Sequence, residues 1–217
     1  MKIEIWSDFV CPFCYIGKRR LEAALEQFPH RDEVQLEFKS FELDPDAPLK
    51  STQSIHEMLA AKYGMTIEKA KEMNAGVGEQ AASVGLTFNF DNMKPTNTFD
   101  AHRLAHYAKK HGKANKITEN LLHAYFTDGK DVSDKETLVA LAEGVGLEAD
   151  AVLAVLNDEQ AYADDVRDDE KTASQIGVRG VPFFVLNGKY AVSGAQASET
   201  FLGALEKVWE EEQNTID

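Results

Sequence analysis

The chain has 217 residues, of which 43% are hydrophobic and 28% are charged. This composition is typical of a folded globular protein, and the length allows one large domain or one domain with an insertion. The formal net charge of −14 argues against a nucleic-acid partner and against an anionic membrane surface, because both need a basic face.

Neither a signal peptide nor a membrane span is predicted. Acidic residues appear before any long apolar run, and no segment approaches the roughly 18 apolar residues of a membrane helix. We therefore expect a cytoplasmic protein. Its two cysteines, Cys11 and Cys14, are too close together to staple a fold of this size. In a reducing cytosol, such a pair indicates a redox-active or metal-binding site.

The first 48 residues predict a strand–helix–strand unit. Apolar residues alternate in 1–6 and again in 34–39, which is the period of a strand. Between them, apolar residues recur at the spacing of one helix face over 16–28, and Pro29 ends that helix. The loop 44–48 closes the unit, which is the start of an α/β layer.

The next block, 49–159, has a helical pattern throughout. Glycines end several of its segments, as is common after helices. The expected helices are 54–63, 66–84 with a break at Gly76 and Gly78, 97–111, a helix around 117–125, one opened by a capping box at Ser133 and Glu136, and 149–156.

The last part of the chain returns to strands. An acidic helix is expected over 161–176, and a final helix over 198–212. Between them, the apolar runs 183–186 and 190–192 flank Asn187-Gly188. This pair favours a β-hairpin, because both turn positions need a positive φ.

The order of these elements predicts the fold class. It is an α/β thioredoxin-like core, formed by 1–48 and 160–217, with a large all-helical insertion over 49–159.

Cys11 and Cys14 lie where the first strand gives way to a helix. One helical turn brings such positions to the same side, so their sulfurs can meet. At a helix N-terminus, unpaired N–H groups and the macrodipole favour a thiolate. We therefore expect Cys11 to be the attacking thiolate and the less exposed Cys14 to resolve the mixed disulfide. Pro12 suits the first helical turn, where its missing N–H is not needed.

The alternative for a Cys-x-x-Cys pair is half of a zinc site. Structural zinc takes four ligands, and the sequence has no second Cys pair. His102 and His106 have helical spacing and could supply two nitrogens, but no sequence feature places them beside Cys11. We therefore predict no metal site.

A second unusual segment is 177–184, in which Pro182 opens an apolar strand. Proline is awkward in a central strand. A cis Val181–Pro182 bond, at a tight approach beside the cysteines, would account for it, although only about 5–6% of X–Pro bonds in folded proteins are cis.

Taken together, these features resemble the DsbA-like thioredoxin superfamily over nearly the whole chain. The resemblance rests on the strand, Cys-Pro-Phe-Cys and helix, and on Gly-Val-Arg-Gly-Val-Pro-Phe-Phe-Val with its hairpin. The motifs 7–17 and 97–104 further resemble the FrnE-like cytoplasmic branch. The resemblance implies that Cys11 is the nucleophile, that Cys14 resolves, that Pro182 is cis and faces the disulfide, and that Val181 offers its backbone to an extended substrate.

Other residues are candidates for substrate binding, namely Pro12, Phe13, Val181, Asn97 and His102. Phe13 is expected to be exposed and Phe9 to be in the core. The resemblance suggests that His102 and Arg103 face the cleft, and a solvated helix face is the equal alternative. Asp8 could relay a proton, but we favour a role in ordering the turn.

Two departures from the family matter. DsbA oxidases often carry His between the cysteines, whereas Pro12 and Phe13 stand here, so the Cys11 thiolate should be less stabilised and the protein a weaker oxidant than periplasmic DsbA. Some FrnE relatives carry a further C-terminal Cys pair, which the tail 210–217 lacks. We therefore expect an external thiol to reset the enzyme.

The predicted function is thiol–disulfide oxidoreduction of protein or small-molecule thiols and disulfides. We expect no tightly bound cofactor, and glutathione is a candidate co-substrate. A homodimer is left open. The alternatives are a glutathione-dependent isomerase or kappa-class-like transferase on the same scaffold, whose members typically have Ser or another residue in place of the reactive pair, and a non-enzymatic metal-binding or redox-sensing module.

Overall fold

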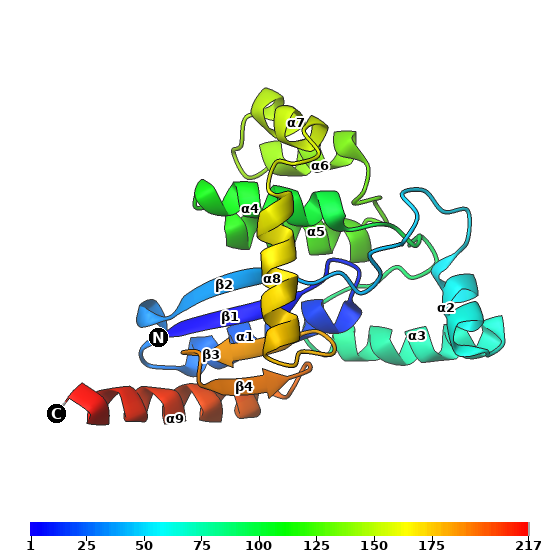
Figure 1. Ribbon diagram of the computed structural model, residues 1–217. Helices are drawn as coiled ribbons and strands as arrows, with labels where there is room; N and C mark the ends of the chain where they lie inside the picture. The colour runs from blue at the N-terminus through cyan, green and yellow to red at the C-terminus, as the bar shows by residue number, and fades with distance from the viewer. Residues whose placement is uncertain (217) are drawn as a thin grey trace.

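A four-stranded sheet with helices on both faces forms one half of the molecule, and a block of helices continues from its β2 edge (Figure 1). The computed structural model describes residues 1–216, so Asp217, the last residue of the predicted core segment, lies outside the described residues. The strand order is β2-β1-β3-β4; β1 is parallel to β2 and antiparallel to β3, and β3 is antiparallel to β4. The strands are β1 Lys2–Ser7, β2 Gln35–Ser40, β3 Phe183–Leu186 and β4 Tyr190–Ser193.

The helices follow the predicted order. They are α1 Pro12–Gln27, α2 Ile55–Tyr63, α3 Ile67–Ala82, α4 Phe99–Lys110, α5 Ala114–Phe126, α6 Lys135–Glu143, α7 Ala149–Asn157, α8 Ala163–Gln175 and α9 Ser198–Ile216. A 3₁₀ turn, Arg31–Glu33, precedes β2. Among the described residues, no helix is long and apolar enough to cross a membrane.

Each face of the sheet buries its own apolar cluster. Alternate residues of β1 and β3 pack with α1 and α9 on one side, as the strand period requires. On the other side, Trp6 and Val185 pack with Ala173 of α8, which crosses the sheet in Figure 1. One face of the sheet therefore packs against α1 and α9, and α8 covers the opposite face.

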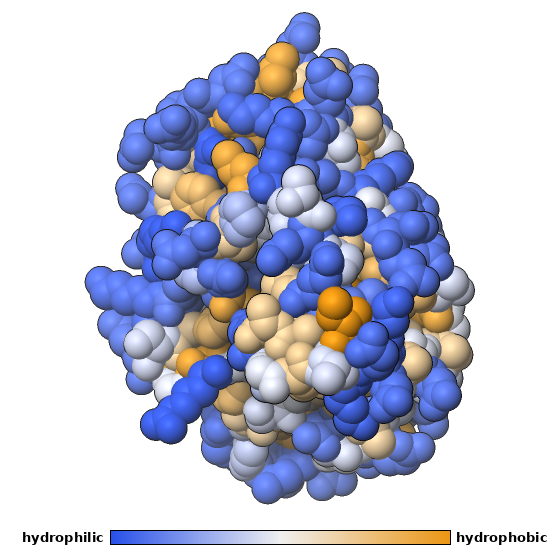
Figure 2. Space-filling view, turned by 90° about the vertical axis from the view of Figure 1, so that its right-hand side faces the viewer, coloured by the Kyte–Doolittle hydropathy of each residue, from blue (hydrophilic) through white to orange (hydrophobic). Residues whose placement is uncertain are grey.

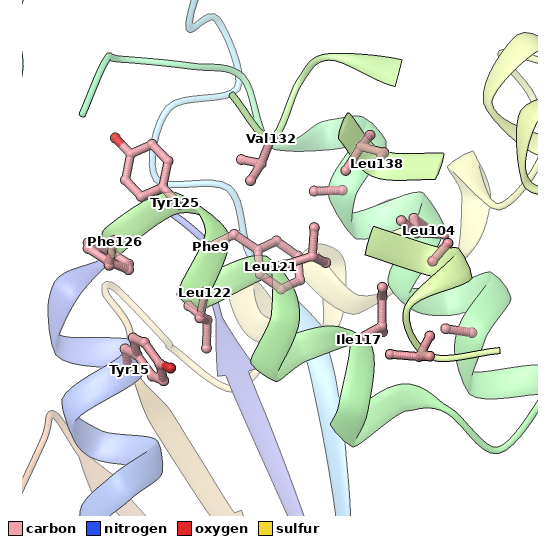
Figure 3. Close-up of a cluster of buried hydrophobic side chains, with 14 of the residues drawn as sticks. Phe9, Tyr15, Leu104, Ile117, Leu121, Leu122, Tyr125, Phe126, Val132 and Leu138 are labelled. Atoms are coloured by element: carbon pink, nitrogen blue, oxygen red, sulfur yellow. The ribbon is translucent and has the colours of Figure 1, made fainter. Parts of the chain in front are cut away.

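The largest apolar cluster joins the helical block to the β1–α1 junction. Phe9 and Tyr15 reach from this junction toward α5, where they meet Leu121, Leu122 and Phe126 (Figure 3). Because these contacts are buried, the junction is clamped between the sheet and the helical block. The division of the chain into segments 1–48, 49–159 and 160–217 stays a prediction.

Three details of the predicted helices are wrong. Helix α3 runs through Gly76 and Gly78 without a break. At α6 the N-cap is Asp134, whose carboxylate accepts from the Thr137 N–H, so the predicted capping box is absent; the Ser133 hydroxyl instead donates to the Leu49 carbonyl. The apolar period over 16–28 places the start of α1 too late, because the helix begins at Pro12 and neither Pro12 nor exposed Phe13 belongs to that period.

The predicted hairpin is confirmed. Asn187 and Gly188 connect β3 to β4 with φ values of 50° and 66°. Gly188 meets this requirement without a side-chain clash, which is the reason that the Asn-Gly pair marks such turns.

Candidate active site

The two cysteines lie at the junction of β1 and α1. Cys11 is the N-cap of the helix, and Pro12 occupies its first position, as predicted. The Cys11 N–H donates to the Asp8 carbonyl at 3.2 Å, and the Cys14 N–H donates to the Cys11 carbonyl at 3.0 Å. The first turn contains no acidic residue. Its unpaired N–H groups therefore present a positive end to Cys11 with no nearby carboxylate from the same turn to neutralise it.

Both thiols are free and buried, with 4% of Cys11 and 3% of Cys14 exposed. Burial raises the pKa of Cys14 well above its usual value, and a hydrogen bond with Cys11 and the charge of Cys11 act in the same direction. The Asp8 N–H and the Ser7 side chain, which also contact the Cys14 sulfur, act in the opposite direction. Cys14 is therefore held as a thiol inside the protein.

The segment before β3 forms the opposite wall of the site. The Cys11 thiol contacts the Val181 carbonyl at 3.5 Å, and the Val181–Pro182 bond is cis. Val181 and Pro182 also line a surface groove with Arg179 and Ser193. The structure thus brings Cys11, Val181 and Pro182 together, although they are far apart in the chain.

Gly17 on α1 sets the distance to this wall. A Cβ at this position would lie 3.1 Å from Pro182 Cγ and 3.3 Å from the Phe184 ring. Only a residue without a side chain lets α1 approach the Pro182 segment this closely.

Phe13 and Phe9 are placed as predicted. Phe13 is 39% exposed beside the cysteines, whereas Phe9 is buried.

Figure 2 views the molecule from the right-hand side of Figure 1, the side of α2 and α3, and shows apolar side chains gathered near the centre of a largely hydrophilic surface. Exposed Ile67 and Met73 belong to α3.

Asp8 orders the turn before the cysteines, as favoured from the sequence. Its buried carboxylate accepts from the Phe9 and Leu43 N–H groups at 2.8 Å each. It has a third partner that the sequence did not indicate, because His102 Nε2 lies 3.2 Å from Asp8 Oδ1. His102 reaches this position from α4, and its ring also packs 4.7 Å from that of Phe9.

The solvated helix face considered for His102 and Arg103 is wrong, because both side chains are buried. Arg103 does not face the cysteines. It donates to the Asp100 carboxylate at 2.6 Å, to the Val155 carbonyl at 2.6 Å and to the Ala161 carbonyl at 2.8 Å. These bonds fasten α4 to α7 and to the chain between α7 and α8.

Asn97 is engaged with the loop that precedes α2. Its amide nitrogen lies 3.2 Å from both the Pro45 and Ala47 carbonyls, and its oxygen accepts from the Phe99 N–H at 2.9 Å. These bonds use the polar atoms of Asn97 within the protein, so a direct contact with a substrate would have to compete with them.

The two histidines considered as metal ligands are each bound to an acid. His106 Nε2 lies 3.1 Å from Asp169 and 3.1 Å from Ser40 Oγ. Within the described part of the chain, no group of three or more His, Cys, Asp or Glu side chains is arranged to hold a metal ion.

An ion-pair group behind the cysteines was missed from the sequence. Glu119 of α5 accepts from the Tyr15 hydroxyl at 2.5 Å and from Lys18 at 2.6 Å, and it also pairs with Arg19. Burial opposes ionisation of Glu119, but hydrogen bonds from Arg19 and Lys18 outweigh it and lower its pKa to about 2. This group ties α1 to α5, and no local pattern indicates it because Glu119 is about a hundred residues away from its three partners on α1.

The sequence and fold also match known proteins. The DSBA-like thioredoxin domain matches residues 2–206. The chain belongs to this family. A solved structure of a "probable DsbA oxidoreductase" from Streptomyces coelicolor has a TM-score of 0.93 at 48% identity, covering 97% of this chain and 91% of that chain. The predicted family and the thioredoxin-like fold with a helical insertion are thereby confirmed.

Two other DsbA-like matches differ in their described activity. The 2-hydroxychromene-2-carboxylate isomerase of Sphingobium xenophagum is 24% identical over 189 residues, which cover 85% of this chain and 88% of that protein. The cytosolic disulfide reductase DsbM from Pseudomonas aeruginosa, solved with GSH, has a TM-score of 0.67 at 15% identity, covering 97% of this chain and 100% of that chain. Membership of the DsbA-like family supports an oxidoreductase or isomerase role in general.

Proposed function

We propose that this protein is a thiol–disulfide oxidoreductase that uses Cys11 as the nucleophile and Cys14 as the resolving thiol. The observation that carries the proposal is the pairing of two free cysteines at the start of α1, with Cys11 at the cap. A thiolate is the attacking species in disulfide exchange, and the helix N-terminus favours the thiolate of Cys11 over that of buried Cys14.

The reaction proceeds in two exchanges. The Cys11 thiolate attacks a substrate disulfide, which forms a mixed disulfide and releases the first substrate sulfur as a thiolate. Cys14 then attacks Cys11 Sγ, which forms the Cys11–Cys14 disulfide and releases the second substrate thiolate. The substrate disulfide gains two electrons and the protein dithiol loses two. The reverse sequence oxidises a substrate dithiol.

Substrate contacts are proposed at the exposed rim around Cys11. The Val181 carbonyl lies at the sulfur, so an extended substrate segment would run beside the backbone of Val181 and Pro182. Pro12 and exposed Phe13 would provide apolar contacts on the other side. For Asn97 and His102 we propose an indirect role, because both are hydrogen-bonded to the segments that shape the site.

Glutathione is the proposed small-molecule co-substrate, and the proposed compartment is the cytoplasm. The similarity in fold to DsbM, a cytosolic disulfide reductase solved with GSH, supports both proposals. We propose that no cofactor is tightly bound, because disulfide exchange needs only the two sulfurs of the protein and those of the substrate.

The test is turnover of glutathione disulfide and of a dithiol peptide by single-cysteine variants. Cys11→Ser should abolish turnover of both, because it removes the attacking sulfur. Cys14→Ser should stop the dithiol reaction after one exchange and accumulate a mixed disulfide on Cys11, detectable by intact mass. Undiminished turnover by Cys11→Ser would refute the assignment.

A second candidate is a glutathione-dependent isomerase, which is favoured by the similarity to 2-hydroxychromene-2-carboxylate isomerase. Such an activity would not need an intramolecular disulfide. Saturable glutathione binding and unchanged isomerisation of an electrophilic substrate by Cys14→Ser would favour it over the oxidoreductase. Loss of activity on disulfides in the same variant would favour the first proposal.

A further inference from the structure

We propose that the groove beside Cys11 favours small disulfides that carry a carboxylate near the sulfur, and that Arg179 is the residue that binds this carboxylate. The inference deepens the proposed function and rests on it, because the groove serves a substrate only if Cys11 is the attacking sulfur. It assigns a substrate class, small anionic disulfides, and a specificity-determining residue outside the cysteine pair.

The groove lies along the segment that leads into β3. Its volume of about 380 Å³ falls within the roughly 300–1,000 Å³ that is usual for small-molecule sites. Val181 lines the groove, and its carbonyl lies 3.5 Å from the Cys11 sulfur. A disulfide that reaches Cys11 therefore brings the atoms next to its own sulfur to this groove.

Arg179 is the charged member of a lining that is otherwise small or apolar. The other residues of the lining are three glycines, Val181, Pro182, Phe183 and Ser193. Among the described residues that line the groove, none is acidic. No carboxylate of the groove itself therefore competes with a substrate for the guanidinium.

The side chain of Arg179 is exposed and has no hydrogen bond, ion pair or ring contact within the part of the chain that the structure describes. Each of the other five arginines has such a partner. Arg19 and Arg167 pair with glutamates, Arg31 and Arg103 pair with aspartates, and Arg20 donates to the Ala195 carbonyl. Guanidinium is a planar fork of five N–H donors that matches a carboxylate at two points. At Arg179 this fork is available to a ligand.

Arg179 is close enough to act on a substrate held at Cys11. It stands two residues before Val181, so their Cα atoms are at most about 7 Å apart, because an extended chain advances about 3.3–3.6 Å per residue. The long side chain of arginine can cover the remaining distance. A carboxylate that is several bonds from the reacting sulfur, as in glutathione disulfide, is therefore within reach.

The charge of the whole chain makes a local cation important for an anionic substrate. The formal charge of −14 repels such a substrate at long range. At an ionic strength of about 0.15 M the Debye length is about 8 Å, so distant charges are largely screened and a direct contact is affected least. A guanidinium–carboxylate contact is also charge-assisted. Selection for the carboxylate therefore occurs at Arg179.

The test uses Cys14→Ser protein, in which the first exchange leaves a mixed disulfide on Cys11 that intact mass detects after acid quench. The three probes are 3,3′-dithiodipropionate, which has two carboxylates, neutral bis(2-hydroxyethyl) disulfide, and cystamine, which has two ammonium groups. At pH 7 and 0.15 M salt, Arg179→Gln should slow the carboxylate probe about three- to tenfold relative to the neutral probe. Cystamine should become faster relative to the neutral probe, and Arg179→Glu should enlarge both changes.

Matched variants separate a specific contact from a change in net charge. Arg31→Gln removes one positive charge outside the groove lining and should leave the ratios among the three rates as in the wild type. Arg179→Lys keeps the charge but loses the fork, so its ratio should lie between those of the wild type and Arg179→Gln. Unchanged ratios in Arg179→Gln and Arg179→Glu would overturn the inference. If the Cys14→Ser protein forms a mixed disulfide with none of the probes, the proposed function itself fails.

Two larger substrates identify the source of the carboxylate. One is glutathione disulfide, and the other is the disulfide of a capped peptide in which Asp follows Cys. Arg179→Gln should slow mixed-disulfide formation with glutathione disulfide more than with the peptide. An equal or larger effect on the peptide would overturn the small-molecule class and assign the contact to an acidic protein segment.

Discussion

At the scale of single residues, the two side chains between the cysteines would set the reduction potential of the proposed redox pair. Phe13 is exposed and apolar, and Pro12 has neither a charge nor an N–H. Neither residue can stabilise a thiolate by charge or by a side-chain hydrogen bond. A histidine at this position would stabilise the thiolate of the reduced pair, and this stabilisation is missing here.

We predict that Phe13→His makes the Cys11–Cys14 pair a stronger oxidant. The imidazole would stabilise the reduced thiolate, so the reduction potential should become less negative by tens of millivolts, about 30 mV for each 1.4 kcal/mol. Equilibration against glutathione buffers measures the potential, and Phe13→Leu is the uncharged control. An equal shift in both variants would show that packing, rather than the imidazole, is responsible.

Gly17 carries a second residue-scale prediction. Gly17→Ala would place a methyl 3.1 Å from Pro182 Cγ, so α1 and the Pro182 segment would have to separate. Overpacking of this kind costs about 1–3 kcal/mol, which should outweigh the helix propensity gained by alanine. Urea unfolding measures the loss. Gly76→Ala in α3 is the matched control, because a Cβ there meets open space, and it should be neutral or stabilising.

At the scale of secondary-structure elements, α1 is held to α5 by the ion-pair group around Glu119. The carboxylate receives Tyr15, Lys18 and Arg19, three residues from adjacent turns of α1. Helix α1 also carries Cys14. The ion-pair group therefore helps to hold the candidate site in place, although none of its members belongs to that site.

We predict that Glu119→Gln lowers the free energy of unfolding at pH 7 by roughly 2 kcal/mol, after allowance for solvent screening of a partly exposed group. The folded-state pKa of about 2 lies below the usual value of 4.5. A lowered pKa stabilises the fold above the unfolded-state value, and this stabilisation is lost as pH falls from about 4.5 to about 2.

Urea unfolding from pH 7 to pH 2 checks this prediction. The wild type and Glu119→Gln should differ at pH 7 and converge at the acidic end. Glu22→Gln is the control, because Glu22 contacts the same Lys18 and Arg19 from a more exposed position and should cost less. A constant difference between wild type and Glu119→Gln at every pH would contradict the electrostatic explanation.

At the scale of the whole molecule, net charge should affect how fast charged substrates reach the candidate active site. The chain carries a formal charge of −14, so its field repels anionic substrates such as glutathione disulfide. Raising ionic strength from about 0.01 M to 0.15 M shortens the Debye length from about 30 Å to about 8 Å. We expect kcat/KM for glutathione disulfide to rise severalfold, and kcat/KM for neutral bis(2-hydroxyethyl) disulfide to change little. Steady-state assays at the two salt concentrations test this, and equal responses would show that local contacts dominate.

Several features of this protein could be predicted from local sequence. Cys11 and Cys14 lie at the strand–helix junction, the Asn187-Gly188 turn connects two strands, and apolar periods locate most helices. Each of these features depends on neighbours within a few residues, which is the range over which backbone preference and hydrophobic period act. The same reasoning failed at Ser133, where two adjacent polar residues could both cap a helix and only the packed structure selects Asp134.

The order of its elements and its cysteine spacing thus let the sequence by itself determine the fold class and the family, and predict Cys11 and Cys14 as the reactive pair. Only the tertiary structure decided what surrounds that pair. It placed Val181 against Cys11, His102 against Asp8, and Glu119 against α1. These contacts join segments about a hundred residues or more apart, and a buried polar group finds its partner only when the whole chain has packed. The physical reason is that a buried polar group has lost its contacts with water and must find a partner within the protein. The spacing of residues along the sequence does not specify which distant residue that partner is.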